Sequence, residues 1–514
     1  MKRRTVAVAL STLALGAAFA APPASAAGGA HYLDCSAPAG GDGNLAHPWN
    51  SLDAASAHRF GPGERLLLKR GTTCEGTLTP TGSGTARAPI TIDAYGSGAK
   101  PVIDAGTTKA TPSAVEIRNE SYWTLANLDI RGGYWRSLWI VGDQPDTTFH
   151  GFRLSNVEVH DNGFRAGGAD GSWLSSVGGV VIEPCNATTK LSGVTLDHVY
   201  AHDTHSVGIQ LGHSEKAAYG TNPASQNTPD CHLGIGLPPT VFPAKDGVSD
   251  ILVDHSESGD NEASGIWATS TTNLTVQHST LYRNGNGGAP ASGKNGKGGL
   301  NGEGFWWSNS YNVLAQYNES YGNKWGGGDG GGFDADTRNE KSLIQYNYAH
   351  DNESYCVATF GGAGSLTTGT VIRHNTCVNN GTYGDAQYEG DIFTWTAGKG
   401  TSTPSTIADY QAYQNTIIRQ NPGPAFYSDS LYDPNQPVSF TQNKVTHADG
   451  AKLVDVLQAG PVLDRNSYTI TGANPQATFV YGDPKVIYPG VAEYRDASKQ
   501  DLRSTFSPAG LEAR

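Results

Sequence analysis

The chain has 514 residues and a formal net charge of −13 at pH 7. Proteins that bind nucleic acid concentrate lysine and arginine on one surface, so this acidic balance argues against a nucleic-acid partner. The 66 glycines and the single methionine, together with sparse helix formers, are typical of a turn-rich β protein. A chain of this length ordinarily divides into two or three domains, unless it grows by repeats along one axis.

The first residues have the layout of a secretory signal peptide. The basic residues Lys2-Arg3-Arg4 precede an apolar run from Thr5 to about Ala21, and the small residues Ala24-Ser25-Ala26 follow it. We therefore expect residues 1–26 to be removed and the mature chain to be secreted, extracellular and soluble. The apolar run is too short to span a bilayer, and no later stretch approaches a span in length, so we expect no membrane partner.

Six cysteines in an exported chain indicate disulfide bonds. Sequence does not determine their connectivity, but chain order favours three pairs that close loops of modest length. The first pair would staple an N-terminal cap and the second would clamp the base of a long insertion, while buried free thiols are the alternative for the third. The pairs are Cys35–Cys74, Cys185–Cys231 and Cys356–Cys377.

One short pattern recurs through the middle of the chain. Each copy has an apolar alternating strand, then a His, Tyr, Asn or Gln, and an Asn or Asp a few positions later. Irregular spacing of such copies is expected for a coil that carries loop insertions on one face. The copies span Leu154–Asp161, Leu196–Asp203, Val253–Asp260, Val276–Asn284, Ala315–Asn323, Ile344–Asp351 and Ile372–Asn380.

The polar columns of this repeat are interpreted as structural. Asparagine tolerates the left-handed backbone conformation, and its amide can bond to the equivalent asparagine one rung away. Histidines His198, His255, His278 and His374 form a second column, which we interpret as a stacked ladder and not as a set of catalytic groups.

Before each copy lies a second short strand, in which a glycine or another small or polar residue precedes an apolar one. Two or three short strands per repeat describe one rung of a parallel β-helix. The dipeptides are Gly208-Ile209, Gly265-Ile266, Gly304-Phe305, Gly332-Phe333, Cys356-Val357 and Asp391-Ile392.

The rung pattern resembles that of the right-handed parallel β-helix superfamily, which includes pectate lyases and many polysaccharide hydrolases. The resemblance implies an all-β fold, a single-stranded right-handed parallel β-helix solenoid with loop insertions, and a carbohydrate-active protein. It does not choose a reaction, because the fold hosts lyases, hydrolases, epimerases and adhesins. The opening is similar to the N-terminal cap of bacterial members in the segments Tyr32-Leu33-Asp34-Cys35, Pro48-Trp49, Phe60-Gly61-Pro62-Gly63 and Ala88-Pro89-Ile90-Thr91-Ile92.

We divide the chain into four parts. Residues 1–26 are the signal peptide, 27–110 the N-terminal cap and first rungs, 111–450 the parallel β-helix, and 451–514 a C-terminal closing region. Insertions near 212–246 and 284–300 are expected to overhang one face and to wall a groove.

Acidic residues gather on neighbouring rungs of the predicted outward face. If the apolar residues that begin the short strands face the core, alternation turns their neighbours outward. Carboxylates one rung apart lie about 5 Å from each other, which is a separation that glycosidases use, and close carboxylates raise one another's pKa. We expect Asp334 to be one catalytic carboxylate, with Glu303, Asp329 or Asp391 as its partner; the alternative is that these acids only form turns.

Aromatic residues accompany the acids. We expect Trp267, Trp306, Phe393 and Trp395 to be exposed and to stack on sugar rings, with Asp336 beside them as a further substrate-binding group. Glycines around the acids would let the substrate approach the backbone.

A calcium-dependent lyase is the rival interpretation. Glu303, Asp329 and Asp334 would then hold Ca²⁺ through oxygen ligands, in a cluster similar to that of the family 9 pectate lyases. Lyase chemistry also needs a lysine or arginine as base, and none stands clearly in the outward column: Lys297 and Lys324 lie in loops and Arg373 lies on another strand.

A non-catalytic carbohydrate-binding β-helix is the third interpretation, but it gives no reason to place several acids beside tryptophans at a desolvation cost. We therefore favour a monomeric, secreted glycoside hydrolase that cleaves an extracellular polysaccharide with paired carboxylates. Calcium is the one cofactor that the lyase alternative requires.

Overall fold

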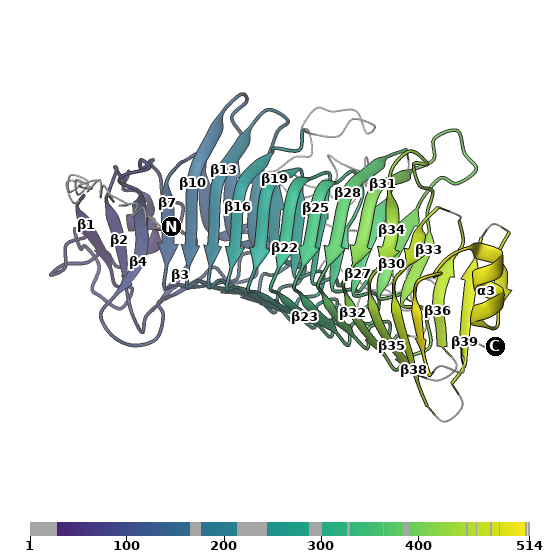
Figure 1. Ribbon diagram of the computed structural model, residues 1–514. Coiled ribbons are helices and arrows are strands. Elements are labelled where there is room, and N and C mark those ends of the chain that lie inside the picture. Colours follow the sequence, from purple (N-terminus) through teal and green to yellow (C-terminus); the bar gives the residue numbers. More distant parts are fainter. Residues whose placement is uncertain are drawn as a thin grey trace, which may run out of the picture.

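The computed structural model describes residues 28–164, 176–212, 244–286, 301–325, 329–362, 364–383, 390–448, 451–458, 460–472, 475–482, 484–508 and 511. Within these residues the chain coils around one long axis (Figure 1), with β1 and β2 at one end and α3 at the other. Each turn of the coil adds one strand to each of three long sheets. None of the helices in the described part of the chain combines the length and the apolar character needed to span a bilayer.

The first sheet has fourteen strands among the described residues. They are β1 (Ala30–Leu33), β2 (Arg65–Lys69), β4 (Ile90–Tyr95), β7 (Trp123–Ala126), β10 (Thr148–Ser155), β13 (Lys190–Asp197), β16 (Val248–Asp254), β19 (Thr271–Gln277), β22 (Tyr311–Gln316), β25 (Glu340–Gln345), β28 (Leu366–Arg373), β31 (Thr406–Tyr413), β34 (Val438–Thr441) and β37 (Val462–Asp464).

The second sheet, again counted over the described ranges, also has fourteen strands, most of them three residues long. They are β3 (Thr73–Glu75), β5 (Val102–Asp104), β8 (Asp129–Arg131), β11 (Glu158–His160), β14 (Tyr200–His202), β17 (Glu257–Gly259), β20 (Thr280–Tyr282), β23 (Glu319–Tyr321), β26 (Tyr348–His350), β29 (Thr376–Val378), β32 (Thr416–Arg419), β35 (Lys444–Ala448), β38 (Ser467–Thr471) and β41 (Thr505–Ser507).

The third sheet, whose strands precede those of the first sheet in each turn, has thirteen strands in the same residues. They are β6 (Ser113–Arg118), β9 (Arg136–Gly142), β12 (Gly178–Pro184), β15 (Val207–Gly212), β18 (Ile266–Thr269), β21 (Phe305–Ser308), β24 (Phe333–Ala335), β27 (Val357–Gly361), β30 (Ile392–Thr396), β33 (Phe426–Asp429), β36 (Ala451–Val456), β39 (Ala477–Tyr481) and β40 (Val486–Tyr488). Apart from the antiparallel pair β39–β40, the paired strands are parallel.

The core follows from the two-residue period of a strand. Phe305, Phe333, Val357 and Ile392 occupy one register position on successive rungs and are fully buried. Because a parallel coil repeats the same direction at every rung, these side chains stack into one continuous apolar core along the axis. The prediction of an all-β parallel β-helix is confirmed.

Asparagine ladders form the corners between sheets. Asn318 donates its side-chain N–H to Asn347 Oδ1 at 3.1 Å, and Asn347 donates to Asn375 Oδ1 at 3.0 Å. A second ladder runs from Asn323 through Asn352 to Asn380. The prediction that asparagine amides bond from rung to rung is therefore confirmed.

One detail of the predicted polar column is wrong. The sequence pattern placed Asp161, Asp203, Asp260 and Asp351 in the same column as the ladder asparagines, whereas each of these aspartates has a positive φ and precedes the buried ladder position by one residue. The left-handed turn residue and the ladder residue thus occupy adjacent positions. Because Asn and Asp are common at both positions, the sequence pattern does not distinguish the two columns.

The histidine column is a stacked ladder, as predicted. His198 stacks on His255 with ring centroids 5.2 Å apart, and His255 stacks on His278 at 4.9 Å. The stack continues through Tyr317 and Tyr346 to His374. Since each ring face is covered by the next ring, this column presents only ring edges to solvent.

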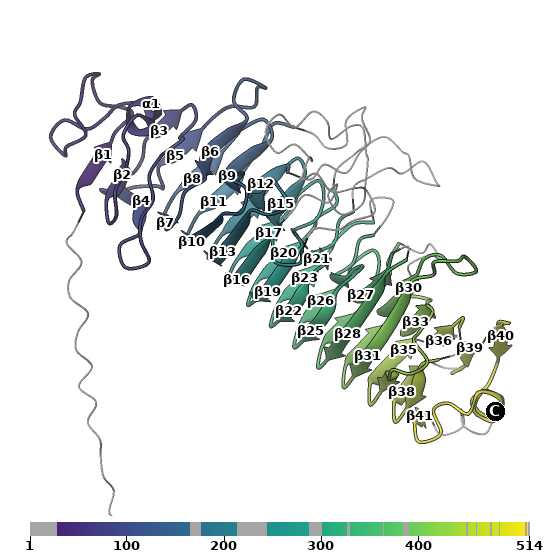
Figure 2. The ribbon, with the colours of Figure 1, turned by 90° about the horizontal axis from the view of Figure 1, so that it is seen from above.

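Both ends of the coil are closed. At the N-terminal end, α1 (Leu52–Ser56) begins at the capping hydroxyl of Ser51, and the Cys35–Cys74 disulfide ties the cap to the first rung of the second sheet (Figure 2). At the other end, α3 (Val491–Ser498) stacks Tyr494 on Phe479. The coil continues past residue 450, because β36 to β41 extend all three sheets.

Two of the three predicted disulfides are confirmed. Besides Cys35–Cys74, Cys356 at the start of β27 bonds to Cys377 in β29, inside the core. Cys231 lies outside the described residues, so the Cys185–Cys231 pair stays a prediction.

Candidate active site

The outward face of the third sheet carries the predicted acidic and aromatic residues. Trp267, Trp306 and Asp334 occupy one register position on β18, β21 and β24, and Ala358 and Phe393 continue it on β27 and β30. The predicted alignment of these rungs is confirmed. Acidic residues therefore lie on two rungs between stacked tryptophans on one side and further aromatic residues on the other.

Three of the four predicted catalytic acids come together. One carboxylate oxygen each of Glu303, Asp329 and Asp334 lies within 4.8 Å of the other two. Glu303 comes from the turn before β21, Asp329 from the turn before β24, and Asp334 from β24 itself. The short distances result from the rung spacing, which sets neighbouring strands about 4.8 Å apart.

Glu303 lies at the bottom of this cluster and is only 1 % exposed. The hydroxyl of Ser264 donates a hydrogen bond to Glu303 Oε2 at 2.7 Å. Burial, aided by the negative charge of Asp336, raises the pKa of Glu303 to about 7, against the lowering effect of the hydrogen bonds. Near neutral pH this carboxyl group is poised between its two protonation states.

Asp334 is also buried, at 3 % exposure. The hydroxyl of Tyr355 donates to Asp334 Oδ2 at 3.2 Å, whereas within the described residues Asp334 Oδ1 has no hydrogen-bond partner. Burial and the charges of Asp336, Asp329 and Glu303 raise the pKa of Asp334 well above its ordinary range. A buried carboxyl group without a counter-charge is held in its protonated form.

Asp329 and Asp336 are more exposed than Glu303 and Asp334: both residues are half-buried, although Asp329 Oδ1 is itself buried. Asn301 donates its side-chain N–H to Asp329 Oδ2 at 3.3 Å and accepts the backbone N–H of Asp329. Burial and the charges of Glu303 and Asp336 raise the pKa of Asp329 well above its ordinary range. The main charged influences on the three shifted carboxyl groups are thus other carboxyl groups, and no lysine or arginine is among them.

Asp391, the fourth predicted acid, does not join the cluster. Arg419 Nη1 donates to Asp391 Oδ2 at 2.7 Å, both side chains are fully buried, and Asn380 donates to the other oxygen. The register of β27 and β30 aligns Asp391 with Cys356, whose side chain faces the core. The corner before β30 therefore turns this carboxylate inward.

The expected exposure of the aromatic residues is wrong for three of the four. Trp267 is 2 %, Trp306 4 % and Phe393 0 % exposed, and only Trp395 is half-buried. Trp267 and Trp306 stack with centroids 5.1 Å apart and pack with Val207 and Ala263. A side chain that points out of the coil can still be covered by its neighbours, which the alternation of a strand does not reveal.

The aromatic border on the other side is also tightly packed. Phe393 stacks on Tyr427 with centroids 4.9 Å apart and contacts Tyr355 and Phe360. These rings and the tryptophan pair surround the carboxyl groups with apolar surface, which is the physical cause of the desolvation that raises their pKa values.

Tyr355 and Ser264 were missed by the sequence analysis. Extending the registers of β18, β21, β24 and β27 back by two residues places Ser264, Glu303, Gly331 and Tyr355 in one column. Aligning the two positions that precede each strand, in addition to the strands themselves, would have identified Ser264 and Tyr355 from the sequence. Asp385 and Glu389, two further acids that precede Asp391 in the sequence, lie outside the described residues.

The carboxylate cluster also fits a hard cation. Calcium takes oxygen ligands at about 2.3–2.6 Å, so ligand oxygens within 4.8 Å of one another are compatible with one shared ion. The buried Oδ1 atoms of Asp329 and Asp334, which lack partners in the described part of the chain, are available for such a role.

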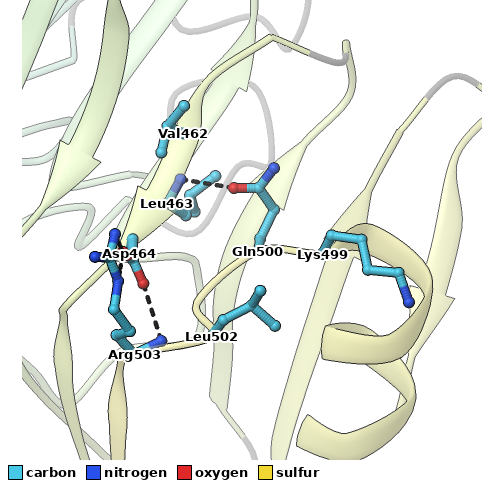
Figure 3. A pocket seen from close by; sticks show the side chains of 7 residues that line it. All are labelled: Val462, Leu463, Asp464, Lys499, Gln500, Leu502 and Arg503. Carbon is cyan, nitrogen blue, oxygen red and sulfur yellow. Dashed lines mark hydrogen bonds and ion pairs between the residues drawn. The ribbon is translucent and has the colours of Figure 1, made fainter.

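A pocket of about 410 Å³ at the C-terminal end of the coil is unrelated to this cluster (Figure 3). In it, Gln500 Oε1 accepts the backbone N–H of Leu463, and Arg503 Nε donates to Asp464 Oδ2 at 2.6 Å. Because Asp464 pairs with Arg503, and Lys499 pairs with Asp496 outside the pocket, we assign it no ligand. It is lined by Val462, Leu463, Asp464, Lys499, Gln500, Leu502 and Arg503.

A right-handed parallel β-helix with a desolvated carboxylate cluster on the outer face of one sheet is thus the class of structure that this chain defines. Residues 178–396, which include the cluster, match the family described as right handed beta helix region. No curated protein matches the sequence.

Solved structures with the same fold include the GH136 lacto-N-biosidase from Eubacterium ramulus. Its selenomethionine derivative is 19 % identical, with a TM-score of 0.57 over 81 % of this chain and 67 % of that one. Its native form is 17 % identical, with a TM-score of 0.50 over 93 % of this chain and 67 % of that one. Pectate lyase Pel9A is 14 % identical, with a TM-score of 0.38 over 87 % and 78 % of the two chains. The likeness to the lacto-N-biosidase, at 17–19 % identity, shows the fold alone.

Proposed function

We propose that this protein is a secreted carbohydrate-active enzyme that hydrolyses glycosidic bonds, with Asp329 and Asp336 as the two carboxyl groups that face the substrate. The observation that carries the proposal is the layering of the cluster: these two acids are half-buried and Glu303 and Asp334 lie beneath them, nearly fully buried. We therefore take the upper pair, and not Glu303 or Asp334, as the groups that approach a sugar.

The two upper carboxyl groups suit the two roles of a glycosidase. A general acid must hold its proton near neutral pH, and the raised pKa of Asp329 meets that need. The second group must be an ionised nucleophile or base, and we assign that role to Asp336, whose negative charge acts on the other three acids.

Asp334, the centre of the site in the sequence analysis, then acts from below as a positioning residue. Its carboxyl group contacts Tyr355 and is nearly inaccessible, so we expect it to keep a proton and to hold the upper carboxyl groups in place. Glu303, held by Ser264, serves in the same way and can exchange a proton with its neighbours near pH 7.

A neutral glycan is the substrate class that this charge distribution favours. The negative charge that we assign to Asp336 repels a uronate, and the half-buried Trp395 suits the apolar face of a sugar ring. The likeness to a lacto-N-biosidase agrees with a neutral oligosaccharide. Residues 1–26 and the disulfides of the cap and core support secretion, and a capped solenoid supports a monomer.

A calcium-dependent lyase is the second candidate, and the mutual approach of three carboxylate oxygens to within 4.8 Å is the observation in its favour. Glu303, Asp329 and Asp334 would hold the ion, which would acidify a uronate substrate. The base would then be a lysine or arginine, and neither type is among the groups that shift the pKa values of Glu303, Asp329 and Asp334.

Product chemistry separates the two. The purified mature protein is incubated with neutral and uronate-containing glycans, with calcium or with chelator, and reducing ends and the ultraviolet absorbance of unsaturated uronates are recorded together. New reducing ends without absorbance, insensitive to chelator and lost in Asp329→Asn, support the hydrolase. Absorbance that requires calcium replaces it with the lyase. Neither signal on any glycan points to a binding protein.

A further inference from the structure

The N-terminal cap contains a cluster of metal-ligating side chains that the proposed function does not use. His31 of β1, His58 after α1 and Glu64 before β2 each offer one ligand atom, and these atoms lie within 4.8 Å of one another. The three elements lie together at the N-terminal end of the coil (Figure 2). His31 precedes His58 by 27 positions, and His58 precedes Glu64 by six. These spacings form no recognisable metal-binding motif, so the cluster has no signature in the sequence.

From this geometry we infer that the cap binds one zinc ion through His31, His58 and Glu64, with water in the fourth position. His31 Nε2 lies 3.3 Å from Glu64 Oε1, and His58 Nε2 lies 3.2 Å from Glu64 Oε2. Zinc bonds of about 2.0–2.2 Å in a tetrahedron place neighbouring ligand atoms about 3.3–3.5 Å apart. The separation of His31 Nε2 from Glu64 Oε1 is close to such an edge, and one ligand atom from each of the three side chains lies within 4.8 Å of the other two.

Both imidazole rings direct Nε2 at the carboxylate of Glu64. Their centroids lie 4.2 Å apart with the planes tilted by 47°, so they are not stacked face to face. Trp49 stacks on His31 at 5.1 Å with an angle of 5°, and Phe60 places its ring edge-on to both histidines. These contacts fix the rings before any metal arrives, which reduces the ordering cost of binding.

The third ligand is prepared as an anion. Burial alone would raise the pKa of Glu64, but hydrogen bonds from the Gly61 backbone N–H, His31 and His58 outweigh it and lower the pKa. The Gly61 N–H donates to Oε2 at 2.6 Å, which leaves Oε1 as the better placed oxygen for a metal and supplies the outer hydrogen bond that ligating carboxylates have. The three side chains are 21–29 % exposed, so water reaches the fourth position.

Two other clusters of histidine and acid in the described residues are less suited to zinc. Asp129 and Asp161 bond to the two ring nitrogens of His160 and raise its pKa to about 9, so that histidine has no free lone pair at neutral pH. The rings of His255 and His278 are stacked and both point Nδ1 at the same oxygen of Asp254. The second cluster serves as a control, because it has the same ligand types on an exposed surface.

Zinc in the cap would join β1, the turn after α1 and the turn before β2. These elements start the coil, and the Cys35–Cys74 disulfide is the other cross-link there. An ion that binds the folded cap but not the unfolded chain raises the stability of the fold by mass action. The cap would then respond to the zinc concentration around the protein.

The test uses the mature protein, stripped with chelator and dialysed, with Zn²⁺ alone as the probe. In isothermal titration, we expect the wild type to bind one more equivalent of zinc than His58→Gln. We expect Glu64→Gln to bind zinc at this site about tenfold to a hundredfold more weakly than the wild type. The thermal midpoint of the wild type should rise with zinc, and that of His58→Gln should not.

The control variant is His278→Gln, which should keep both the equivalent and the rise. His58→Gln retains an N–H donor toward Glu64, so its midpoint without zinc should match the wild type and show that the cap still folds. Equal zinc stoichiometry in wild type and His58→Gln, or an equal zinc-dependent rise in both, would overturn the inference. Glycan cleavage is measured separately, because the zinc cluster and the acidic cluster lie far apart along the coil. Glu64 precedes β2, and β22 follows β21 of the acidic cluster. In the first sheet, β2 and β22 are separated by β4, β7, β10, β13, β16 and β19.

Discussion

Tyr355 donates its hydroxyl hydrogen to Oδ2 of Asp334 across adjacent rungs, at 3.2 Å and with both side chains buried. This bond lowers the pKa of Asp334, against the burial and the negative charges that raise it. Tyr355 thus links the aromatic residues of β27 and β30 to Asp334 in the acidic cluster. Its hydrogen bond limits how far the pKa of Asp334 rises.

Replacing Tyr355 by phenylalanine tests this link. Tyr355→Phe keeps the ring packing and removes one buried hydrogen bond, which we expect to cost about 0.5–1.5 kcal/mol of stability in denaturant unfolding. The loss of the donor raises the pKa of Asp334 further, so the pH–activity profile should move at its carboxyl limb while the fold persists. An unchanged profile together with unchanged stability contradicts a role for this bond.

The upper pair of acids is tested by isosteric amides. We expect Asp329→Asn and Asp336→Asn each to lower kcat at least about a hundredfold, because each removes a proton donor or a charge that the reaction needs. Thermal midpoints should stay near that of the wild type or rise, since removing one of several repelling carboxyl groups relieves the cluster. Asp203→Asn, at an exposed turn, is the control and should keep full activity; a comparable loss in the control would point to a general effect on the fold.

The pH dependence of stability follows from Glu303. Its pKa rises from an ordinary value near 4.5 to about 7 on folding, so the folded protein binds this proton more tightly than the unfolded chain does. Stability from this group is present below about pH 4.5 and is lost as the pH rises toward 7. The rise corresponds to at most about 3–4 kcal/mol, at about 1.4 kcal/mol per pKa unit.

Glu303→Gln removes that titration. Between pH 5 and pH 8 the variant should lose less stability than the wild type in urea unfolding, by up to the same amount. The same slope in both proteins would mean that Glu303 does not change its protonation between these values. Added calcium that flattens the wild-type slope would favour the metal-binding alternative, because a bound cation stabilises the ionised cluster.

Sequence patterning predicted the parts of this structure that depend on the direction of side chains along a strand. The shared register of Phe305, Phe333, Val357 and Ile392, and therefore the approach of Asp334 to its neighbours, follows from the two-residue period. The burial of Trp267 and Trp306 does not follow, because it depends on what packs over them. Likewise, Asp334 is more deeply buried than Asp329. This difference depends on the three-dimensional packing and cannot be inferred from the alignment of the repeats.

Corners set the other limit. Glu303 lies two residues before the inward Phe305 and points outward, whereas Asp391 lies one residue before the inward Ile392 and points into the core. Alternation continued from the strand would give the opposite directions. The backbone leaves the extended conformation at these turns, so the period of the strand no longer applies, and Glu303 and Asp391 cannot be assigned to a face without the structure.

The buried Asp391–Arg419 pair leads to a last prediction, on stability. Arg419→Met leaves the Asp391 carboxylate buried without a counter-charge, which typically costs about 3–5 kcal/mol. The double variant Asp391→Leu, Arg419→Met replaces both charges by apolar groups of similar size and should recover most of that loss in denaturant unfolding. Each folded double-variant molecule should cleave glycans at the wild-type rate, because the pair lies inside the coil and not on the acidic face. Loss of activity in a stable double variant would instead support Asp391 as a catalytic partner of Asp334, which is one of the sequence-based expectations.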